Sequence, residues 1–308
     1  MAYTNYKKST GKDSNFKWVR SIYGKGDNAQ QQYNYIPSAG MNEVIKDWHD
    51  RQSPREFNSA TPSRLLTCPR VAWLTKHNVP ATNETTWAMK QRMLLGRLFE
   101  NQFAEQLKDV GQLLYHWKDD DGVEVTKFAT GENETLLTGV PDYLIKVKDK
   151  LGNEVIAISD AKTSRSDSFG YLPISDEELF TDWGYYKYRM QLTAYYLLAH
   201  TNKDWFKKNN LPLPTHLHLF TYALDDGIVR RELLWQPTEE DIVTVMQKVR
   251  LINEALVATE MPECTCTNSF DNFDVKFCKY GVKVDGSKIA ETCCADSLSN
   301  LVNKGEIK

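Results

Sequence analysis

Apolar residues recur along the chain with two different periods, and the order of these periods predicts the elements of the fold. A helical spacing of three to four residues links a set of apolar positions in one segment: Leu95, Leu98, Phe99, Phe103, Leu107 and Val110. β-Branched runs over 142–148 and 154–159 flank the polar segment 149–153, and this arrangement predicts a β-hairpin.

The second half of the chain contains one more strand pair between two helices. The first helix is expected around 185–200. Alternating residues over 216–222 predict a strand that turns at 225–227 and returns over 228–235. Thr238 is the predicted N-cap of a long amphipathic helix that ends near Ala258.

These elements predict an α/β protein with a mixed sheet, a helical N-terminal region and a cysteine-rich C-terminal tail. The predicted organisation is a polar extension over 1–60, a helical region over 61–135, an α/β core over 136–235, and a helix with the tail over 236–308. The extension is expected to be partly disordered, because residues 23–35 are rich in Gly, Gln and Asn and show no apolar period.

The composition is typical of a globular protein, with 308 residues of which 41% are hydrophobic and 26% are charged. The sequence has no long apolar run, and its first residues lack the apolar stretch of a secretory signal, so the cytoplasm is the expected location and no membrane contact is expected. The net charge of −3 differs from the basic character of proteins that coat DNA without sequence preference. A nucleic-acid function must therefore come from a local site.

Two acidic residues stand at the ends of the predicted hairpin strands. Asp142 opens the first strand and Asp160 closes the second, so antiparallel pairing brings them to the same end of the sheet. Lys162 lies two residues beyond Asp160 and shares its face. Paired carboxylates suit Mg²⁺ or Mn²⁺, and a lysine beside them can orient the attacking water or stabilise charge that develops on phosphorus.

Gly-Val-Pro-Asp142 followed by Asp160-Ala161-Lys162 resembles the Asp…Asp-x-Lys motif of the PD-(D/E)XK nucleases. The resemblance implies a restriction-endonuclease-like α/β core and metal-dependent hydrolysis of DNA. It also implies that Asp142, Asp160 and the carbonyl of Ala161 hold Mg²⁺ or Mn²⁺, and that Lys162 assists the water or the transition state. The triplet Asp-x-Lys is common by itself, and the predicted hairpin between the two acids supports its interpretation as the nuclease motif.

Two further motifs resemble the RecB/AddB branch of this superfamily, which includes the RecB-like exonucleases associated with CRISPR adaptation. Gln191-Leu-Thr-Ala-Tyr195 resembles the Gln-x-x-x-Tyr motif, whose two side chains share a helix face and position the DNA strand. Gly96-Arg-Leu-Phe-Glu100 resembles the Gly-x-x-x-His element, with Glu100 at the position of the metal-binding histidine. A carboxylate also ligates Mg²⁺. The alternatives are that Tyr195 belongs to the core and that Glu100 is a solvated helix residue.

The resemblance implies an exonuclease that acts on single-stranded or end-processed DNA in recombination, replication or repair. Compact nucleases of this kind also occur in bacteriophages, and the polar extension suits that origin. The sequence has no phosphate-binding loop or helicase motif, so unwinding would come from a helicase, a recombinase or a single-strand-binding partner. Two other classes stay open: a non-catalytic module that binds DNA ends, against which the intact Lys162 argues, and a zinc-stapled interaction protein.

The cysteines are unevenly distributed, with Cys68 alone near the start and five in the tail: Cys264, Cys266, Cys278, Cys293 and Cys294. In a cytoplasmic chain such clustering indicates metal ligation more than disulfides. Cys68-Pro69 resembles the upstream element of the AddB-like relatives, in which one early and three late cysteines hold a 4Fe–4S cluster. The ligands that this resemblance implies are Cys68, Cys278, Cys293 and one of Cys264 or Cys266. Four thiolates suit Zn²⁺ as well, and buried free thiols are the remaining alternative.

Two other polar patterns are less specific. His216 and His218 alternate on one strand face, where a core or solvated strand is a better interpretation than a zinc site. The run Tyr185-Tyr-Lys-Tyr-Arg189 mixes aromatic and cationic residues, as proteins that bind single strands do.

Overall fold

The computed structural model describes residues 58–79, 81, 87–117, 136–164, 183–225, 227–263, 280, 283–284 and 288–289. All of them belong to one of two compact units, Arg55–Lys308, and the other unit is Met1–Pro54. The predicted polar extension over 1–60 therefore lies outside the described residues, apart from residues 58–60.

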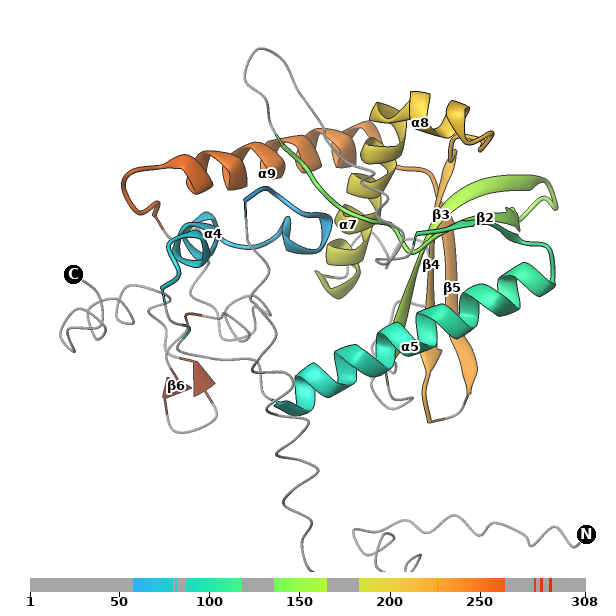
Figure 1. The fold of residues 1–308 in the computed structure, drawn as a ribbon, viewed down its shortest axis with the longest axis horizontal. Coiled ribbons are helices and arrows are strands. Elements are labelled where there is room, and N and C mark those ends of the chain that lie inside the picture. Colours follow the sequence, from blue (N-terminus) through green and yellow to red (C-terminus); the bar gives the residue numbers. More distant parts are fainter. Residues whose placement is uncertain are drawn as a thin grey trace, which may run out of the picture. The chain divides into compact units, whose positions relative to one another are not determined.

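In the described part of the chain, groups of helices and groups of strands follow one another along the sequence (Figure 1). In order these are η1 (Pro62–Arg64), α4 (Pro69–Lys76), α5 (Trp87–Asp109), β1 (Leu113–His116), β2 (Tyr143–Lys148), β3 (Glu154–Ser164), α7 (Trp183–Thr201), α8 (Lys203–Lys208), β4 (His216–Ala223), β5 (Ile228–Trp235), α9 (Glu239–Val257), β6 (Lys283–Val284) and β7 (Lys288–Ile289).

A five-stranded mixed sheet in the order β1-β2-β3-β4-β5 forms the centre of this unit. β3 and β4 are parallel, and the other neighbouring strands are antiparallel. A parallel pair requires a crossover connection, and α7 and α8 lie in the segment that joins β3 to β4. The prediction of an α/β protein with a mixed sheet crossed by a helix is thus confirmed.

The predicted hairpin is β2–β3, in which Tyr143 pairs with Ser159 and Lys148 with Glu154. The Asp149 carboxylate accepts hydrogen bonds from the backbone N–H groups of Leu151 (2.9 Å) and Asn153 (2.8 Å) in the turn. Gly152 has φ +85° there, a conformation that side chains with a Cβ rarely adopt. The turn residues therefore fix the register on which the position of the acids depends.

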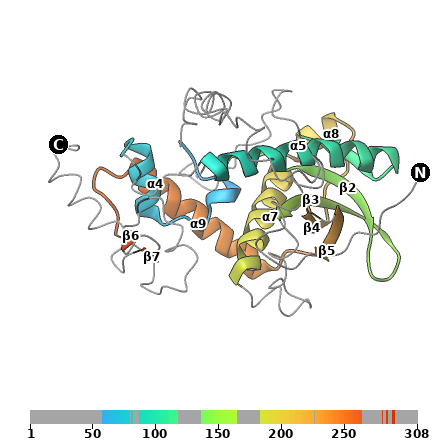
Figure 2. The same ribbon diagram turned by 90° about the horizontal axis from the view of Figure 1, so that it is seen from below.

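The two faces of the sheet pack against different helices (Figures 1 and 2). Side chains between α5 and the sheet form one core, which includes Ala104, Tyr143, Ala157, Ala161 and Phe220. Side chains on the opposite face pack against α7 and α9 in a larger core, which includes Leu144, Ile158, Leu192, Leu219 and Val249. On β2, β3, β4 and β5, residues at alternate strand positions belong to different cores, as the pleat requires.

Helix α9 begins with the predicted N-cap. The Thr238 hydroxyl accepts from the Asp241 N–H at 3.1 Å, and the Asp241 carboxylate accepts from the Thr238 N–H at 3.3 Å, which completes a capping box. Asp241 also forms a buried ion pair with Arg189 of α7. The cap therefore ties α9 to the helix that crosses the sheet.

Several features differ from the sequence pattern. The segment over 61–135, predicted as helical, also provides the edge strand β1. Of the apolar positions predicted to share one face of α5, Leu95 and Leu98 are exposed, whereas Leu107 is buried. Strand β3 continues to Ser164 and does not end near Asp160. Among the described helices, none combines the length and apolar character needed to cross a bilayer.

Candidate active site

Asp142 and Asp160 meet on the face of the sheet that packs against α7. The β2–β3 register, continued by one residue, sets Asp142 opposite Asp160. Both acids lie two residues from core residues of that face, Leu144 and Ile158. Asp142 accepts a hydrogen bond from the Ala161 N–H through Oδ2 at 3.1 Å, and Asp160 is 2% exposed. The structure therefore brings the predicted pair of carboxylates together.

Lys162 completes this group as the sequence spacing predicts. Its ammonium forms an ion pair with Oδ2 of Asp160, while 26% of its side chain stays exposed. The ammonium also lies 5.3 Å from the ring centroid of Tyr188 on α7, a cation–π distance. Lys162 is thus held at the edge of the site, partly accessible from outside.

Gln191 and Tyr195 point from α7 at the same carboxylate. The Gln191 amide donates to Oδ1 of Asp160 at 3.3 Å and to the Tyr195 hydroxyl at 3.4 Å. Both side chains are buried, and Tyr195 also belongs to the core under α7. The spacing of four residues on a helix accounts for their common direction.

Gly139 allows the segment before Asp142 to approach α7 closely. A Cβ atom at this position would lie 2.5 Å from Cδ of Pro62 and 3.1 Å from a ring carbon of Tyr195. Ala60 and Leu137 form a bridge nearby, and both are fully buried. The predicted Gly-Val-Pro-Asp sequence therefore matters here because only a residue without a side chain fits at its start.

Glu100 lies on α5, and its negative charge acts on Asp142. The Tyr143 hydroxyl donates to the Glu100 backbone oxygen at 2.8 Å, which fixes α5 against β2. A Cβ atom on Gly96 would lie 3.3 Å from the Thr163 hydroxyl oxygen, so α5 also packs closely on β3. The side chain of Glu100 is half-buried. It is near enough to raise the pKa of Asp142.

The charges of the site act on one another strongly. Burial raises the pKa of Asp142 well above its usual value, and the negative charges of Asp160 and Glu100 raise it further. Burial would lower the pKa of Lys162, but the charges of Asp160 and Asp142 outweigh burial and raise it, so the amine stays protonated. Burial, followed by the charges of Asp160 and Asp142, also raises the pKa of Tyr195, which keeps its proton.

The oxygen atoms of this group suit a hard divalent cation. Two carboxylates face each other, with the Lys162 ammonium paired to one of them, and burial together with the charge of Asp160 raises the pKa of Asp142. Within the described residues no three His, Cys, Asp or Glu side chains converge as a complete ligand set. Mg²⁺ commonly needs only one or two carboxylates, because waters and substrate phosphates fill its other positions. Asp142, Asp160 and the Ala161 carbonyl are compatible with that pattern.

Of the cysteines, only Cys68 falls within the described residues. It is buried and occupies the N-cap position of α4. The other predicted ligands, Cys264, Cys266, Cys278 and Cys293, lie outside the described residues, and so does Cys294. The predicted cluster is therefore not visible as a set of converging thiols.

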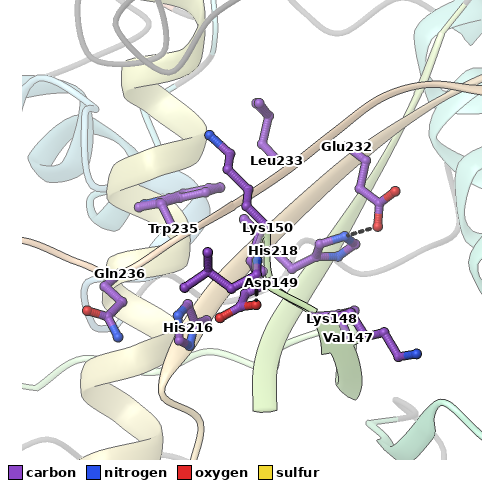
Figure 3. A pocket seen from close by; sticks show the side chains of 12 residues that line it. Val147, Lys148, Asp149, Lys150, His216, His218, Glu232, Leu233, Trp235 and Gln236 are labelled. Carbon is purple, nitrogen blue, oxygen red and sulfur yellow. Dashed lines mark hydrogen bonds and ion pairs between the residues drawn. The ribbon is translucent and has the colours of Figure 1, made fainter. Parts of the chain in front are cut away.

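The two strand histidines take part in a different arrangement at the hairpin-turn end of the sheet (Figure 3). His218 contacts the Ser159 hydroxyl at 2.7 Å and Glu232 at 3.0 Å. A cavity of about 480 Å³ opens beside them, lined also by His216 and by the turn residue Asp149. Ser159, His218 and Glu232 have the residue types of a Ser-His-Glu triad, and the Ser159 side chain is fully buried.

Sequence reasoning missed one contact and one residue on the active-site face. Tyr188 contacts Lys162, although the aromatic run around it gave no indication of this partner. The same run contains Tyr185, which is buried in the core, and Arg189, which is paired with Asp241. Arg231 lies on β5 in the same cross-strand row as Lys162, and only the strand register reveals this.

No family model and no curated protein matches the chain. Among solved structures, the protein SSO0001 aligns at 17% identity over 83% of this chain and 99% of its own, with a TM-score of 0.40. An alkaline exonuclease from Laribacter hongkongensis aligns at 11% identity over 68% of this chain and 92% of its own, with a TM-score of 0.36. The same exonuclease in complex with dAMP aligns at 14% identity over 65% and 88%, with a TM-score of 0.35. At such identities and TM-scores these likenesses assign no function.

Proposed function

We propose that this protein is a metal-dependent deoxyribonuclease of the PD-(D/E)XK type. The observation that carries the proposal is the pair Asp142 and Asp160 on adjacent strands, with the Lys162 ammonium paired to Asp160. Gln191 adds a hydrogen bond to the same carboxylate from the crossing helix. The four side chains combine acids, a cation and an amide around one point, which is the chemistry that phosphodiester hydrolysis requires.

In this proposal a water oxygen attacks phosphorus, and the bond from phosphorus to one sugar oxygen breaks. The products are a phosphate monoester and a free hydroxyl end, and the proton of the water passes to the leaving oxygen. Because Lys162 keeps its proton, it serves as a fixed positive charge next to the phosphoryl oxygens and stabilises the transition state. The Gln191 amide holds the direction of the Asp160 carboxylate, and the Tyr195 hydroxyl lies next to that amide.

Asp142, Asp160 and the carbonyl of Ala161 would hold Mg²⁺ or Mn²⁺, with Glu100 near them, and the cation supplies Lewis-acid polarisation of the phosphate. Nothing else in the proposed steps depends on which of the two cations binds.

The proposed substrate is single-stranded or end-processed DNA, and the proposed action is exonucleolytic, as in the RecB/AddB branch. Lys162 and Tyr188 lie together at the accessible edge of the site. A cation beside an aromatic ring suits a phosphate and the base next to it. Strand separation would come from a helicase, recombinase or single-strand-binding partner in the cytoplasm of a cell or of a phage-infected host.

Digestion of end-labelled linear and circular single-stranded DNA tests this function. Wild-type protein should degrade linear DNA with Mg²⁺ or Mn²⁺ and leave it intact in EDTA, and exonucleolytic action predicts that circular DNA survives. Asp160→Ala should remove at least about 10²-fold of the rate. DNA that stays intact under every metal condition, while the protein still binds it, would leave a non-catalytic DNA-end-binding module as the function.

We also propose that Cys68 and three tail cysteines hold a 4Fe–4S cluster. Helix α4, whose N-cap is Cys68, and the residues just after it contact two points close to tail cysteines: Arg70 donates to the Pro262 oxygen at 2.7 Å, and the Tyr280 hydroxyl donates to the Val79 oxygen at 3.1 Å. Cys264 follows Pro262 by two residues and Cys278 precedes Tyr280 by two residues. Such a cluster would join the start of the unit to its end.

Metal analysis of anaerobically purified protein tests the cluster. Iron near four atoms per chain and a brown colour are expected, and Cys68→Ser should bleach the colour and lower the melting temperature. Cys294→Ser should have a milder effect, because two adjacent cysteines do not readily ligate one cluster. One zinc per chain in colourless protein would favour a zinc staple, and metal-free protein with free thiols would contradict both.

A further inference from the structure

The active-site face carries a second cationic position in the same cross-strand row as Lys162. Lys162 on β3 pairs with Thr221 on β4, and Thr221 pairs with Arg231 on β5. Leu219 and Leu233, two residues from Thr221 and Arg231, belong to the core on the α7 side. Because residues two apart share a face, the row points to the same side of the sheet as Asp160.

Thr221 is chemically unlike its neighbours on that face of β4. The other residues of β4 whose side chains lie on this face are Leu217, Leu219 and Ala223, and all three are fully buried. The Thr221 hydroxyl is buried as well, and within the described part of the chain it has no hydrogen-bond partner. A buried hydroxyl without a partner is rare in proteins. The position of the Thr221 hydroxyl between Lys162 and Arg231 indicates that its hydrogen-bond acceptor belongs to a bound anionic ligand.

Arg231 also differs from other arginines of this unit. Arg70 donates to the Pro262 oxygen, Arg189 to Asp241 and Arg250 to Glu254. In the ranges that the structure describes, Arg231 has neither an ion pair nor a hydrogen bond, although it is half-buried. β5 is an edge strand, so the row of Lys162 and Arg231 is open at this side of the sheet. An arginine fork in such a position suits the two oxygens of a phosphate.

We propose that Arg231, together with the Thr221 hydroxyl, binds a backbone phosphate of single-stranded DNA next to the phosphate that lies at Lys162. This inference rests on the proposed nuclease function. Neighbouring strands lie about 4.8 Å apart, so β3 and β5 are separated by about 10 Å. The flexible Lys162 and Arg231 side chains bridge part of that gap. A DNA single strand that crosses this row places one phosphate at Lys162 and a neighbouring phosphate at Arg231. Arg231 thus fixes which phosphodiester of the DNA lies over Asp142 and Asp160.

Salt-dependent binding of a labelled single-stranded oligonucleotide, measured by fluorescence anisotropy in EDTA, tests this position. Arg231→Ala should raise Kd about tenfold and reduce the slope of log Kd against log salt by about 0.7, the value for one lost phosphate contact on a single strand. Arg231→Lys should keep the slope and lose part of the affinity, because it keeps the charge and loses the fork. Arg250→Ala removes an equal charge from an exposed position on α9 and serves as the matched control.

Thr221→Val separates a binding role of the hydroxyl from a structural one. The proposal predicts a higher Kd with an unchanged or higher melting temperature, because the variant removes a hydroxyl that lacks a partner in the free protein. A lower melting temperature with an unchanged Kd would show that the hydroxyl serves the fold and would remove it from the binding position.

The same Kd and slope in Arg231→Ala as in wild type, or as in Arg250→Ala, would overturn the inference. Because binding is measured without a divalent metal, its result does not depend on cleavage. Protein that binds through Arg231 but never cuts DNA would contradict the nuclease and retain the second position. Protein that cuts DNA with the same KM after Arg231→Ala would retain the nuclease and overturn the second position.

Discussion

Neutralising Asp142 should stabilise the metal-free protein while it abolishes activity. Burial and the charge of Asp160 raise the pKa of Asp142. A carboxyl with a folded-state pKa above its unfolded value binds its proton more tightly when folded, so the protein loses stability as pH rises from the ordinary Asp range through the raised pKa. The ionised form of Asp142 is therefore unfavourable in the folded protein, and Asp142→Asn removes this cost.

The size of the effect follows from the strand geometry. Side chains directly opposite in an antiparallel pair are about 5 Å apart, and two like charges at that distance repel by about 3 kcal/mol at an effective dielectric constant of about 20. Lys162, which is ion-paired with Asp160, offsets part of this repulsion. A remaining gain of about 1–2 kcal/mol corresponds to a rise of about 2–8 °C in melting temperature for a unit of this size.

Thermal unfolding in EDTA and in millimolar Mg²⁺ or Mn²⁺ measures this effect. Asp142→Asn should melt above wild type in EDTA, and the metal should stabilise wild type but not the variant. Asp149→Asn is the matched control with the opposite sign, because a hydrogen bond from Asn153 lowers the pKa of Asp149 and its charge is favourable. A variant that melts below wild type in EDTA would refute the reasoning, since the carboxylate would then stabilise the folded state.

Four further changes have defined outcomes. Glu100→Gln should raise the Mg²⁺ concentration for half-maximal activity while the protein stays folded, and an unchanged metal titration would return Glu100 to a role on the helix surface. At low metal concentration, activity should rise with pH as Asp142 loses its proton. A higher metal concentration should move the midpoint of this pH profile to lower pH, because metal and proton compete for the carboxylate. A midpoint that does not change with metal concentration would contradict this. Gln191→Ala should lower kcat about tenfold or more in an activity assay, because the hydrogen bond to Asp160 is lost. Gly139→Ala should lower the free energy of unfolding by about 1–3 kcal/mol through overpacking, as measured by denaturant unfolding.

Local sequence patterns predicted the elements that depend on interactions between residues close in the sequence. The β2–β3 hairpin follows from two β-branched runs and a polar turn, and the structure has it with Tyr143 opposite Ser159. The start of α9 follows from the predicted N-cap Thr238, which the structure shows in a capping box with Asp241. The convergence of Asp142, Asp160 and Lys162 is a consequence of the same hairpin, and this is why one sequence sufficed to predict it.

Features that depend on tertiary packing were beyond the sequence. Leu95 and Leu98 match the helical period of α5, yet they are exposed because only part of that stripe meets the sheet. The contact of Tyr188 with Lys162 depends on where α7 crosses β3, and the row from Lys162 to Arg231 depends on two strand registers. Pairing of distant strands leaves little trace in a local pattern, because many registers bury the same apolar residues.

The rate of DNA cleavage in Lys162→Ala, compared with Lys146→Ala under single-turnover conditions, tests the proposed active site most directly. Lys146 lies on the same hairpin and pairs with Glu154 at 3.4 Å, so its variant removes an equal charge away from the acids. The proposed site predicts that Lys162→Ala lowers the rate at least about 10²-fold with folding intact, while Lys146→Ala stays near wild type. Near-wild-type rates in both variants would contradict the assignment of Asp142, Asp160 and Lys162 as the catalytic centre.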